Sequence, residues 1–317
     1  MRTRIFYTVA LLLVSFTAFA GGLNESDVTS ETSTAAEPQQ ALVEITDARG
    51  QVVTVTDASR VVSLGSAVSE IIVALEQTDR LVGVDLTSTF PEEALAAIPK
   101  TGYVRDLSAE GILSLDPTLV IGTVDMGPPE VIEQIESAGV SVAVVPEDDS
   151  IAGSAERVRF IAELLSALQE ADSVIADIDD QESELLQLIG DVPVDQRPSV
   201  LFIYARGAGT VMVSGAGTSA DAMIQLAGGR NAVAGFGGYR PLTPEAAIGA
   251  NPDYILLTSS GLGSLGGVEG LAEIPGIAQT DAFAARRILA YDDIYLLSFG
   301  PRAASAALEL AEALYSE

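Results

Sequence analysis

The chain has 317 residues, of which 48% are apolar, 16 are basic and 45 are acidic, and it contains no histidine and no cysteine. The two missing side chains exclude a Ser-His pair, a thiol nucleophile, an imidazole metal site and a disulfide framework. The net charge of −29 makes nucleic acid and anionic membranes unfavourable partners, so we expect neither. The apolar content is enough for a sizeable core in one or two domains.

The first twenty residues differ in kind from the rest. Arg2 and Arg4 precede an apolar run that ends in small residues, a pattern typical of a cleaved secretory signal peptide over residues 1–20. Its removal would change the net charge from −29 to −31. So much negative charge suggests a protein from a salt-rich habitat, where salt screens the repulsion between neighbouring carboxylates. The alternative is an ordinary acidic secreted protein. Residues 21–41 are small, polar and acidic, and are predicted to be a disordered linker.

Residues 42–150 are predicted to form an N-terminal α/β lobe. The lobe opens with LVEITD and VVTVTD on either side of ARGQ, and their alternation predicts a small hairpin. From Val61 onward, short β-rich runs alternate with helical patterns. This alternation predicts a parallel sheet with helices on its faces.

A long helical pattern follows the first lobe. Over residues 151–190, apolar residues recur at steps of three and four, and no glycine or proline interrupts them between Ser154 and Ile189. We therefore expect one long inter-lobe helix. The α/β pattern resumes over residues 191–317, the predicted C-terminal lobe. The predicted fold is α/β, with two Rossmann-like lobes joined by one long helix.

An internal repeat supports two related lobes. Residues 105–123 can be laid over residues 240–258 at a constant offset of 135. Each copy has an arginine, a hydroxyl residue at a helix start, a short helix, an X-Pro turn and a buried strand. Repeated lobes place equivalent loops opposite one another across a cleft, and ligands usually bind in such clefts.

Two glutamates occupy equivalent positions in the two copies. Ser108 and Thr243 are predicted helix N-caps, so Glu110 and Glu245 fall in the first turns. A carboxylate there stabilises the helix by roughly 0.3 to 1 kcal/mol, which explains both residues without a function. Their symmetry, one per lobe, indicates instead a pair of surfaces that could dock on a two-fold partner carrying arginines.

Tyr103 and Arg105 are candidate ligand-binding residues. A deprotonated phenol is a hard ligand for ferric iron and an established axial ligand of haem. A nearby guanidinium favours the charged phenolate. Because histidine and cysteine are absent, tyrosine is the most plausible protein ligand for a haem iron. A Tyr-x-Arg pattern alone is a weak indication, since tyrosines in loops mostly pack or form hydrogen bonds.

Two glycine-containing stretches in the second lobe also need an interpretation. Residues 235–242, GFGGYRPL, place two aromatic rings and Arg240 where they could contact a flat macrocycle and its carboxylates; the alternative is a turn with ordinary packing. Residues 215–220, GAGTSA, fit a dinucleotide-binding fingerprint. They lack an acidic residue at the end of a following strand, so we predict a tight turn.

Taken together, these motifs resemble the periplasmic haem-binding proteins of ABC-type haem importers, within the cobalamin and siderophore group of substrate-binding proteins. The likeness runs from about Arg60 to Tyr315. It implies a helical-backbone binding protein of the class III type, which is not an enzyme. It also implies a periplasmic monomer that captures haem b in the cleft between its lobes. The absence of cysteine leaves no thiol for a lipid anchor at the signal cleavage site, so we expect the chain to have none. An outer-membrane haem receptor system is a further implied partner.

The resemblance assigns roles to individual residues. Tyr103 would be the axial haem ligand, and Arg105 its hydrogen-bonding partner. Arg240 and Tyr239 would lie near the ligand on the opposite lobe. Phe236 is at a position where some relatives have a histidine, which implies a five-coordinate site whose other face Phe236 shields.

Glu110 and Glu245 would match the lobe-tip glutamates that dock on arginines of the ABC permease dimer. Two alternatives stay open. A corrinoid such as vitamin B12, or a ferric siderophore, could bind to the same fold. An exported α/β enzyme that uses carboxylates or the GAGTSA turn is a more remote alternative.

Overall fold

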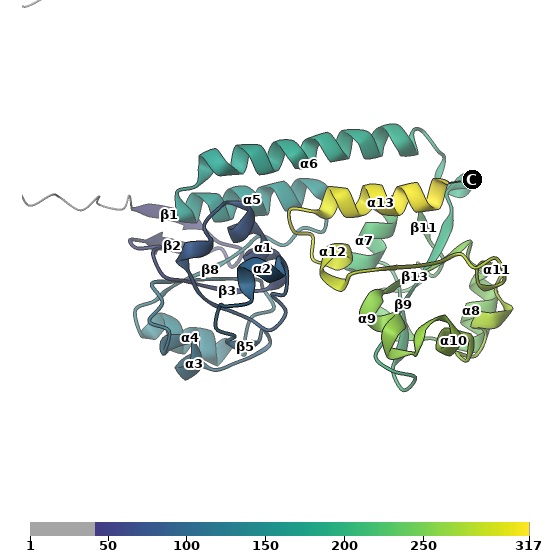
Figure 1. Cartoon of the computed structure of the whole chain (residues 1–317), viewed down its shortest axis with the longest axis horizontal. Coiled ribbons are helices and arrows are strands. Elements are labelled where there is room, and N and C mark those ends of the chain that lie inside the picture. The colour runs from purple at the N-terminus through teal and green to yellow at the C-terminus, as the bar shows by residue number, and fades with distance from the viewer. Residues whose placement is uncertain (1–41, 317) are drawn as a thin grey trace, which may run out of the picture. The chain divides into compact units, whose positions relative to one another are not determined.

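The computed structural model describes residues 42–316, so the predicted signal peptide (1–20) and linker (21–41) lie outside the described residues. Figure 1 shows two α/β lobes, with long helices lying along both of them. Within residues 42–316, no helix is long and apolar enough to cross a membrane.

The predicted hairpin precedes the first sheet. β1 (Val43–Thr46) pairs antiparallel with β2 (Val52–Val55), and Val43 lies opposite Val55. Val53 and Val55 are buried while their neighbours along β2 are exposed. The alternation in the sequence therefore reflects one covered face, and the prediction is confirmed.

The first lobe is built on a parallel sheet with the strand order β4-β3-β7-β8. Its strands are β3 (Val61–Leu64), β4 (Leu81–Val84), β7 (Leu119–Gly122) and β8 (Ser141–Val144). Its helical segments are α1 (Ser66–Ala74), η1 (Thr78–Arg80), α2 (Glu92–Leu95), α3 (Ala109–Leu113) and α4 (Pro129–Ser137). Strands β3 and β7 are buried throughout, because α1 packs on one face of the sheet and α3 and α4 on the other. The predicted parallel sheet is confirmed.

The second lobe is built on a mixed sheet with the order β12-β10-β9-β13-β14, and β11 also pairs with β9. Its strands are β9 (Ser199–Ala205), β10 (Val211–Ser214), β11 (Arg230–Asn231), β12 (Tyr239–Pro241), β13 (Tyr254–Thr258) and β14 (Ile288–Tyr291). Its helical segments are η2 (Val194–Gln196), α7 (Ser219–Leu226), α8 (Pro244–Ala250), α9 (Ser259–Ser264), α10 (Gly267–Ala272), η3 (Ile277–Gln279), α11 (Asp281–Ala284) and α12 (Asp293–Leu297). Strands β9, β13 and β14 are parallel, whereas β10 and β12 run antiparallel to their neighbours.

The segment predicted as a single helix forms two helices. α5 (Ile151–Leu165) ends at Ser166, which adopts the left-handed conformation with φ 52°, and α6 (Leu168–Ile189) begins two residues later. The prediction of one uninterrupted helix over residues 151–190 was therefore wrong. α6 packs beside α5 and α13 (Ala303–Tyr315), and these two helices cover its apolar face. If α5 and α6 formed one straight helix, that apolar face would be exposed to solvent. α6 is the one long helix that lies along both lobes (Figure 1).

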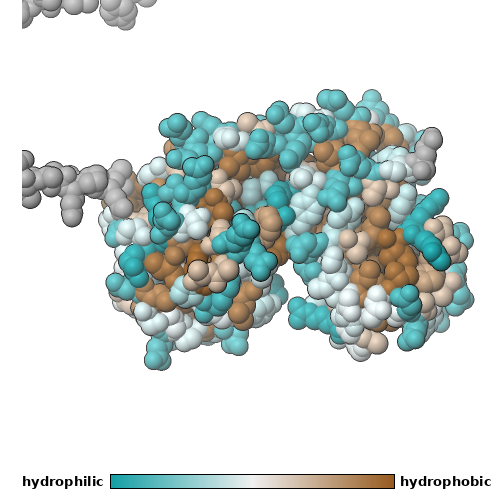
Figure 2. All heavy atoms as spheres, viewed as in Figure 1, coloured by the Kyte–Doolittle hydropathy of each residue, from teal (hydrophilic) through white to brown (hydrophobic). Residues whose placement is uncertain are grey.

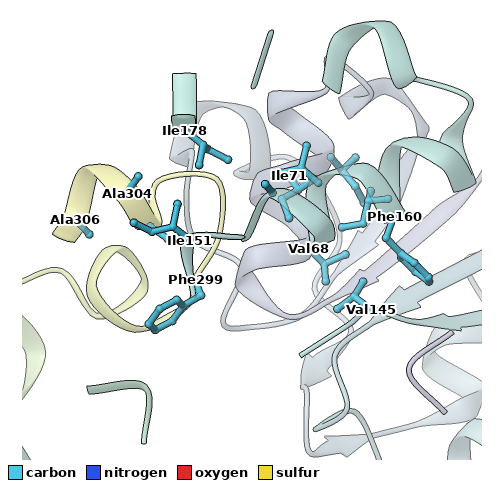
Figure 3. Packing of buried hydrophobic residues seen from close by; sticks show 14 of the residues in the cluster. Val68, Ile71, Val145, Ile151, Phe160, Ile178, Phe299, Ala304 and Ala306 are labelled. Carbon is cyan, nitrogen blue, oxygen red and sulfur yellow. The ribbon is translucent and has the colours of Figure 1, made fainter. Parts of the chain in front are cut away.

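One hydrophobic cluster extends from the first lobe into the second. It contains Ile71 of α1 and Phe202 of β9, and the buried faces of α5, α6 and α13 connect them. Figure 3 shows part of this cluster, including Ile151 of α5 and Phe299 of the segment before α13. Opening the lobes widely would expose this shared apolar surface to water, at a cost of roughly 25 cal/mol for each Å². The cluster therefore restrains the angle between the lobes.

A buried ion pair reinforces this connection. Glu70 of α1 is only 4% exposed and accepts two hydrogen bonds from Arg302, at the start of α13. The Arg302 guanidinium also lies 3.7 Å from the ring centre of Phe90. Burial raises the pKa of Glu70, and the hydrogen bonds and charge of Arg302 offset part of that effect. Arg302 thus stabilises the charged form of the buried Glu70 carboxylate.

We predict that Arg302→Gln lowers the free energy of unfolding by about 3 kcal/mol near neutral pH, because it leaves a buried carboxylate without its cation. The pKa of Glu70 is already raised in the folded state, and loss of Arg302 raises it further. As the pH falls towards 4.5, the ordinary pKa of a glutamate, Glu70 takes up a proton and the difference from wild type shrinks. Urea unfolding at both pH values measures this, with the exposed Arg159→Gln as the control. An equal loss at both pH values would contradict the prediction.

Helix α6 carries dense negative charge. Within Leu168–Ile189 the helix has no lysine or arginine and has seven acidic residues, namely Glu170, Asp172, Asp177, Asp179, Asp180, Glu182 and Glu184. We predict that the unfolding temperature rises when NaCl is raised from about 0.1 M to about 1 M, because the screening length falls from about 10 Å to about 3 Å. Thermal unfolding in sucrose of equal osmolality is the control, because sucrose is excluded from the protein surface but does not screen charge. A melting temperature that is independent of salt would remove the support for a salt-rich habitat.

Candidate functional site

A cleft lies between the two lobes, where Figure 2 shows the surface hollowed. It has a volume of about 290 Å³. One wall consists of the loops that follow β3, β7 and β8, and the other includes Ser219, Leu297 and Ser298 of the second lobe. Open α/β sheets bind ligands at the carboxyl ends of their strands, so the cleft has the position expected of a ligand site.

Tyr103 and Arg105 lie together on a small hairpin in the cleft wall. β5 (Gly102–Tyr103) pairs antiparallel with β6 (Asp106–Leu107), and the two residues between these strands form the turn. Both side chains line the cleft. Tyr103 is 42% exposed, so its phenol is open to a ligand.

The guanidinium of Arg105 is paired with a carboxylate. Its Nη2 donates to Oδ2 of Asp125, and this hydrogen bond raises the pKa of Arg105. The charge of Asp125 and the nearby phenol of Tyr103 add to the rise. In the part of the chain that the structure describes, Arg105 forms this bond and none to Tyr103.

Asp125 is a cleft residue that the sequence analysis missed. It lies three residues after β7, and the end of a buried strand was the signal that could have identified it.

The second-lobe residues predicted to contact a ligand also lie close together. Arg240 and Tyr239 belong to β12, and the Arg240 guanidinium is 4.6 Å from the ring centre of Phe236. Burial raises the pKa of Tyr239, and the charge of Asp149 contributes to the rise. Phe236, Tyr239 and Arg240 are not among the residues that line the cleft, whose second-lobe wall consists of Ser219, Leu297 and Ser298.

A second Tyr-x-Arg pair was missed in the sequence. Tyr204 and Arg206 follow one another at the carboxyl end of β9, and the Arg206 guanidinium is 5.6 Å from the Tyr204 ring centre. The rings of Tyr204 and Tyr239 lie 5.9 Å apart at an interplanar angle of 60°. The pattern at 103–105 recurs at 204–206, and a search for it would have identified both residues.

The predicted helix caps of the repeat are confirmed. Ser108 accepts a hydrogen bond from the N–H of Gly111, and Thr243 accepts one from the N–H of Ala246. Glu110 and Glu245 follow in the first turns of α3 and α8 and are exposed.

The two copies also share a positive φ before the X-Pro turn, although α3 ends at Leu113 with Ser114 as its C-cap, whereas Asn251 is itself the C-cap of α8. Asp116 and Asn251, which are 135 positions apart, both adopt positive φ, of 50° and 33°. The repeat in the sequence therefore corresponds to a shared local structure.

The GAGTSA stretch connects β10 to α7. The N–H groups of Gly215 and Ala216 donate to Gly238 and Phe236, and that of Gly217 donates to Asp221. These amides are already occupied within the chain, so the stretch forms a turn and offers no cradle for a phosphate. The prediction of a tight turn is supported by this geometry.

A larger cavity, of about 770 Å³, contains none of the predicted site residues. Its lining includes one guanidinium, that of Arg302, and four carboxylates, those of Glu70, Glu76, Glu170 and Asp177. The smaller cleft also has carboxylates in its lining, those of Asp125, Glu147 and Asp149, but it has two guanidiniums, so the larger cavity is the less favourable of the two for an anionic ligand. We therefore assign the candidate site to the smaller cleft, in which tyrosine and arginine side chains meet. Among residues 42–316, no group of three or more histidine, cysteine or acidic side chains could hold a metal ion.

Comparison with known proteins identifies the class. The family model described as periplasmic binding protein matches residues 61–295, and the chain belongs to that family. The periplasmic heme-binding protein RhuT from Roseiflexus sp. RS-1, solved in apo form, is similar in structure with a TM-score of 0.77. It is 43% identical over 82% of this chain and 98% of its own.

Two relatives of known sequence are similar to most of this chain. The uncharacterized ABC transporter substrate-binding lipoprotein YvrC from Bacillus subtilis is 27% identical over 97% of this chain and 96% of its own length. A cobalamin-binding protein from Halobacterium salinarum is 23% identical over 82% of this chain and 70% of its own length. The fold predicted from the sequence, that of a class III periplasmic binding protein, is confirmed.

Proposed function

We propose that this chain is the haem-capturing component of an ABC-type haem importer, which binds haem b between its lobes and delivers it to a permease in the inner membrane. The observation that carries the proposal is the exposed phenol of Tyr103 beside the guanidinium of Arg105 in the inter-lobe cleft. The likeness to RhuT supports the same ligand. Binding and release require no covalent step, so no catalytic residues are proposed.

The cleft residues fit the chemistry of haem. Tyr103 would supply an oxygen ligand to ferric iron, and Arg105 would place a positive charge in the same cleft wall. Asp125 forms an ion pair with Arg105, so a contact between Arg105 and haem would involve an exchange of that partner. Phe236, with Arg240 over its ring, would face the macrocycle from the second lobe.

A corrinoid is the second candidate ligand, because the Halobacterium salinarum relative is a cobalamin-binding protein. The exposed phenol of Tyr103 in the cleft favours haem, since a tyrosinate is a ligand for ferric iron. Titration of the purified chain with hemin, cobalamin and a ferric hydroxamate, followed by visible absorption, decides between them. Saturation by cobalamin alone would overturn the haem proposal.

Location and assembly form part of the same proposal. Membership of the periplasmic binding protein family supports a periplasmic location. We propose that the chain works there as a monomer and receives haem from an outer-membrane receptor system. Gel filtration with light scattering tests the monomer, and a dimer at micromolar concentration would contradict it.

We predict that Tyr103→Phe removes the charge-transfer band of the ferric haem complex and weakens hemin binding at least about tenfold, because an iron–oxygen bond is lost. Absorption titration measures both effects. Tyr291→Phe is the matched control, because that hydroxyl is bonded only weakly, to the carbonyl of Glu309 on α13. Tyr204→Phe in the same series shows whether the second phenol also reaches the iron. An unchanged spectrum in Tyr103→Phe would exclude Tyr103 as a ligand.

We predict that Glu110→Gln and Glu245→Gln each reduce haem-dependent stimulation of the permease ATPase, while hemin affinity stays within about twofold of wild type. Both carboxylates are exposed, one per lobe, where they could pair with arginines of a two-fold permease. Reconstituted permease in liposomes provides the measurement. Glu130→Gln is the control, because Glu130 is an exposed carboxylate in the first turn of α4. Full stimulation by the double variant would exclude this docking role.

A further inference from the structure

Arg157 is a buried arginine that faces the cleft. It lies on α5, is 4% exposed and lines the same cavity as Tyr103. Its Nε donates to the carbonyl of Pro146 at 3.0 Å, and its Nη1 donates to the carbonyls of Ser298 and Phe299 at 3.3 and 2.7 Å. Among residues 42–316, no carboxylate lies within 4.0 Å of this guanidinium, and its Nη2 forms no hydrogen bond.

The charge of Arg157 is only loosely balanced. Burial lowers the pKa of Arg157, and the carboxylates of Asp149, Glu147 and Asp148 partly oppose that effect. These three residues lie on the loop after β8, and Glu147 and Asp149 line the same cleft as Arg157 without forming an ion pair with it. Buried charges in proteins are normally paired, so an anionic group that entered the cleft would supply a partner.

The first turn of α1 adds a second favourable feature to the same place. Ser66 and Ala67 line the cavity, and α1 has no side-chain cap and no acidic residue in its first turn. The N–H of Gly65 donates to Asp85, whereas those of Ser66 and Ala67 have no acceptor within the described residues. Free amides at a helix start attract anions.

We propose that Arg157 and the first turn of α1 form a carboxylate-binding subsite at the floor of the cleft, which holds one propionate of the bound haem. This inference rests on the proposed function. The volume of 290 Å³ is at the lower limit of the roughly 300–1,000 Å³ of ligand pockets, so the enclosed part admits one edge of the macrocycle. The propionate edge is the one that offers Arg157 a counter-charge. Arg157 is therefore proposed as an orienting residue, distinct from the iron ligand.

A purely structural role is the competing explanation. The carbonyls that Arg157 binds belong to both lobes, so the residue also links them. Loss of that link would weaken the binding of any ligand to the cleft. Loss of a carboxylate contact would weaken only ligands that carry the charge.

The test uses the full chain with hemin and with hemin dimethyl ester, whose carboxylates are uncharged. We expect wild type to prefer hemin about 10- to 100-fold, the range for a hydrogen bond between charged groups. Arg157→Gln should bind hemin about 10- to 100-fold more weakly than wild type, and its affinity for the ester should fall by less than about threefold. Arg159→Gln, which removes an exposed arginine of the same helix, should change neither. Affinities come from absorption titration.

Equal losses for the two ligands in Arg157→Gln would overturn the subsite and leave a structural link. If that variant does not fold, Ser66→Asp tests the subsite instead. A carboxylate in the first turn of α1 should weaken the binding of hemin and leave the binding of the ester unchanged. Equal affinity of wild type for hemin and its ester would also overturn the subsite, while the haem proposal would stand. If wild type binds neither ligand, the proposed function itself fails.

Discussion

The apolar surface shared by α5, α6 and α13 is the constraint on which the rest of this structure depends. Each lobe has a sheet covered on both faces, and one of the covering layers is common to the two lobes. Separating the lobes would expose that layer to water, so the cleft between them exists before any ligand arrives. Glu70 and Arg302 add a polar contact at the same junction, where a buried carboxylate is tolerated only beside its cation.

A preformed cleft suits the capture of a large rigid ligand. Little conformational entropy has to be lost on binding when the walls already have their places. It also places the two halves of the internal repeat in fixed positions, each with an exposed glutamate on a capped helix. Two such points at a fixed separation are what a two-fold permease could recognise in one rigid contact.

The cleft contains arginines as well as carboxylates, with Asp125, Glu147 and Asp149 among its lining residues. The chain has a net charge of −29, yet Arg105 and Arg157 line the cleft, and Arg240 lies over an aromatic ring on the second lobe. Long-range repulsion of an anionic ligand would be screened by salt, whereas contacts inside the cleft are screened much less. A protein this acidic could therefore hold an anion only through local contacts with cations such as Arg105 and Arg157.

The sequence by itself determined the α/β class, the leading hairpin, the caps at Ser108 and Thr243, and the two-lobed repeat. These features depend on local periodicity and on side chains that bond to their own backbone, so neighbouring residues suffice to predict them. The absence of histidine and cysteine also drew attention to tyrosine, and Tyr103 was chosen because an arginine lies two positions away, a pattern that Tyr204 and Arg206 share.

Only the tertiary structure decided where the chain reverses at Ser166, since no glycine or proline marks a turn that long-range packing imposes. It alone showed that Asp125 holds Arg105, that Tyr204 lies against Tyr239, and that Arg157 is buried in the cleft. Each of these facts is a contact between segments far apart in the chain, and periodicity along the sequence carries no record of which distant side chains meet.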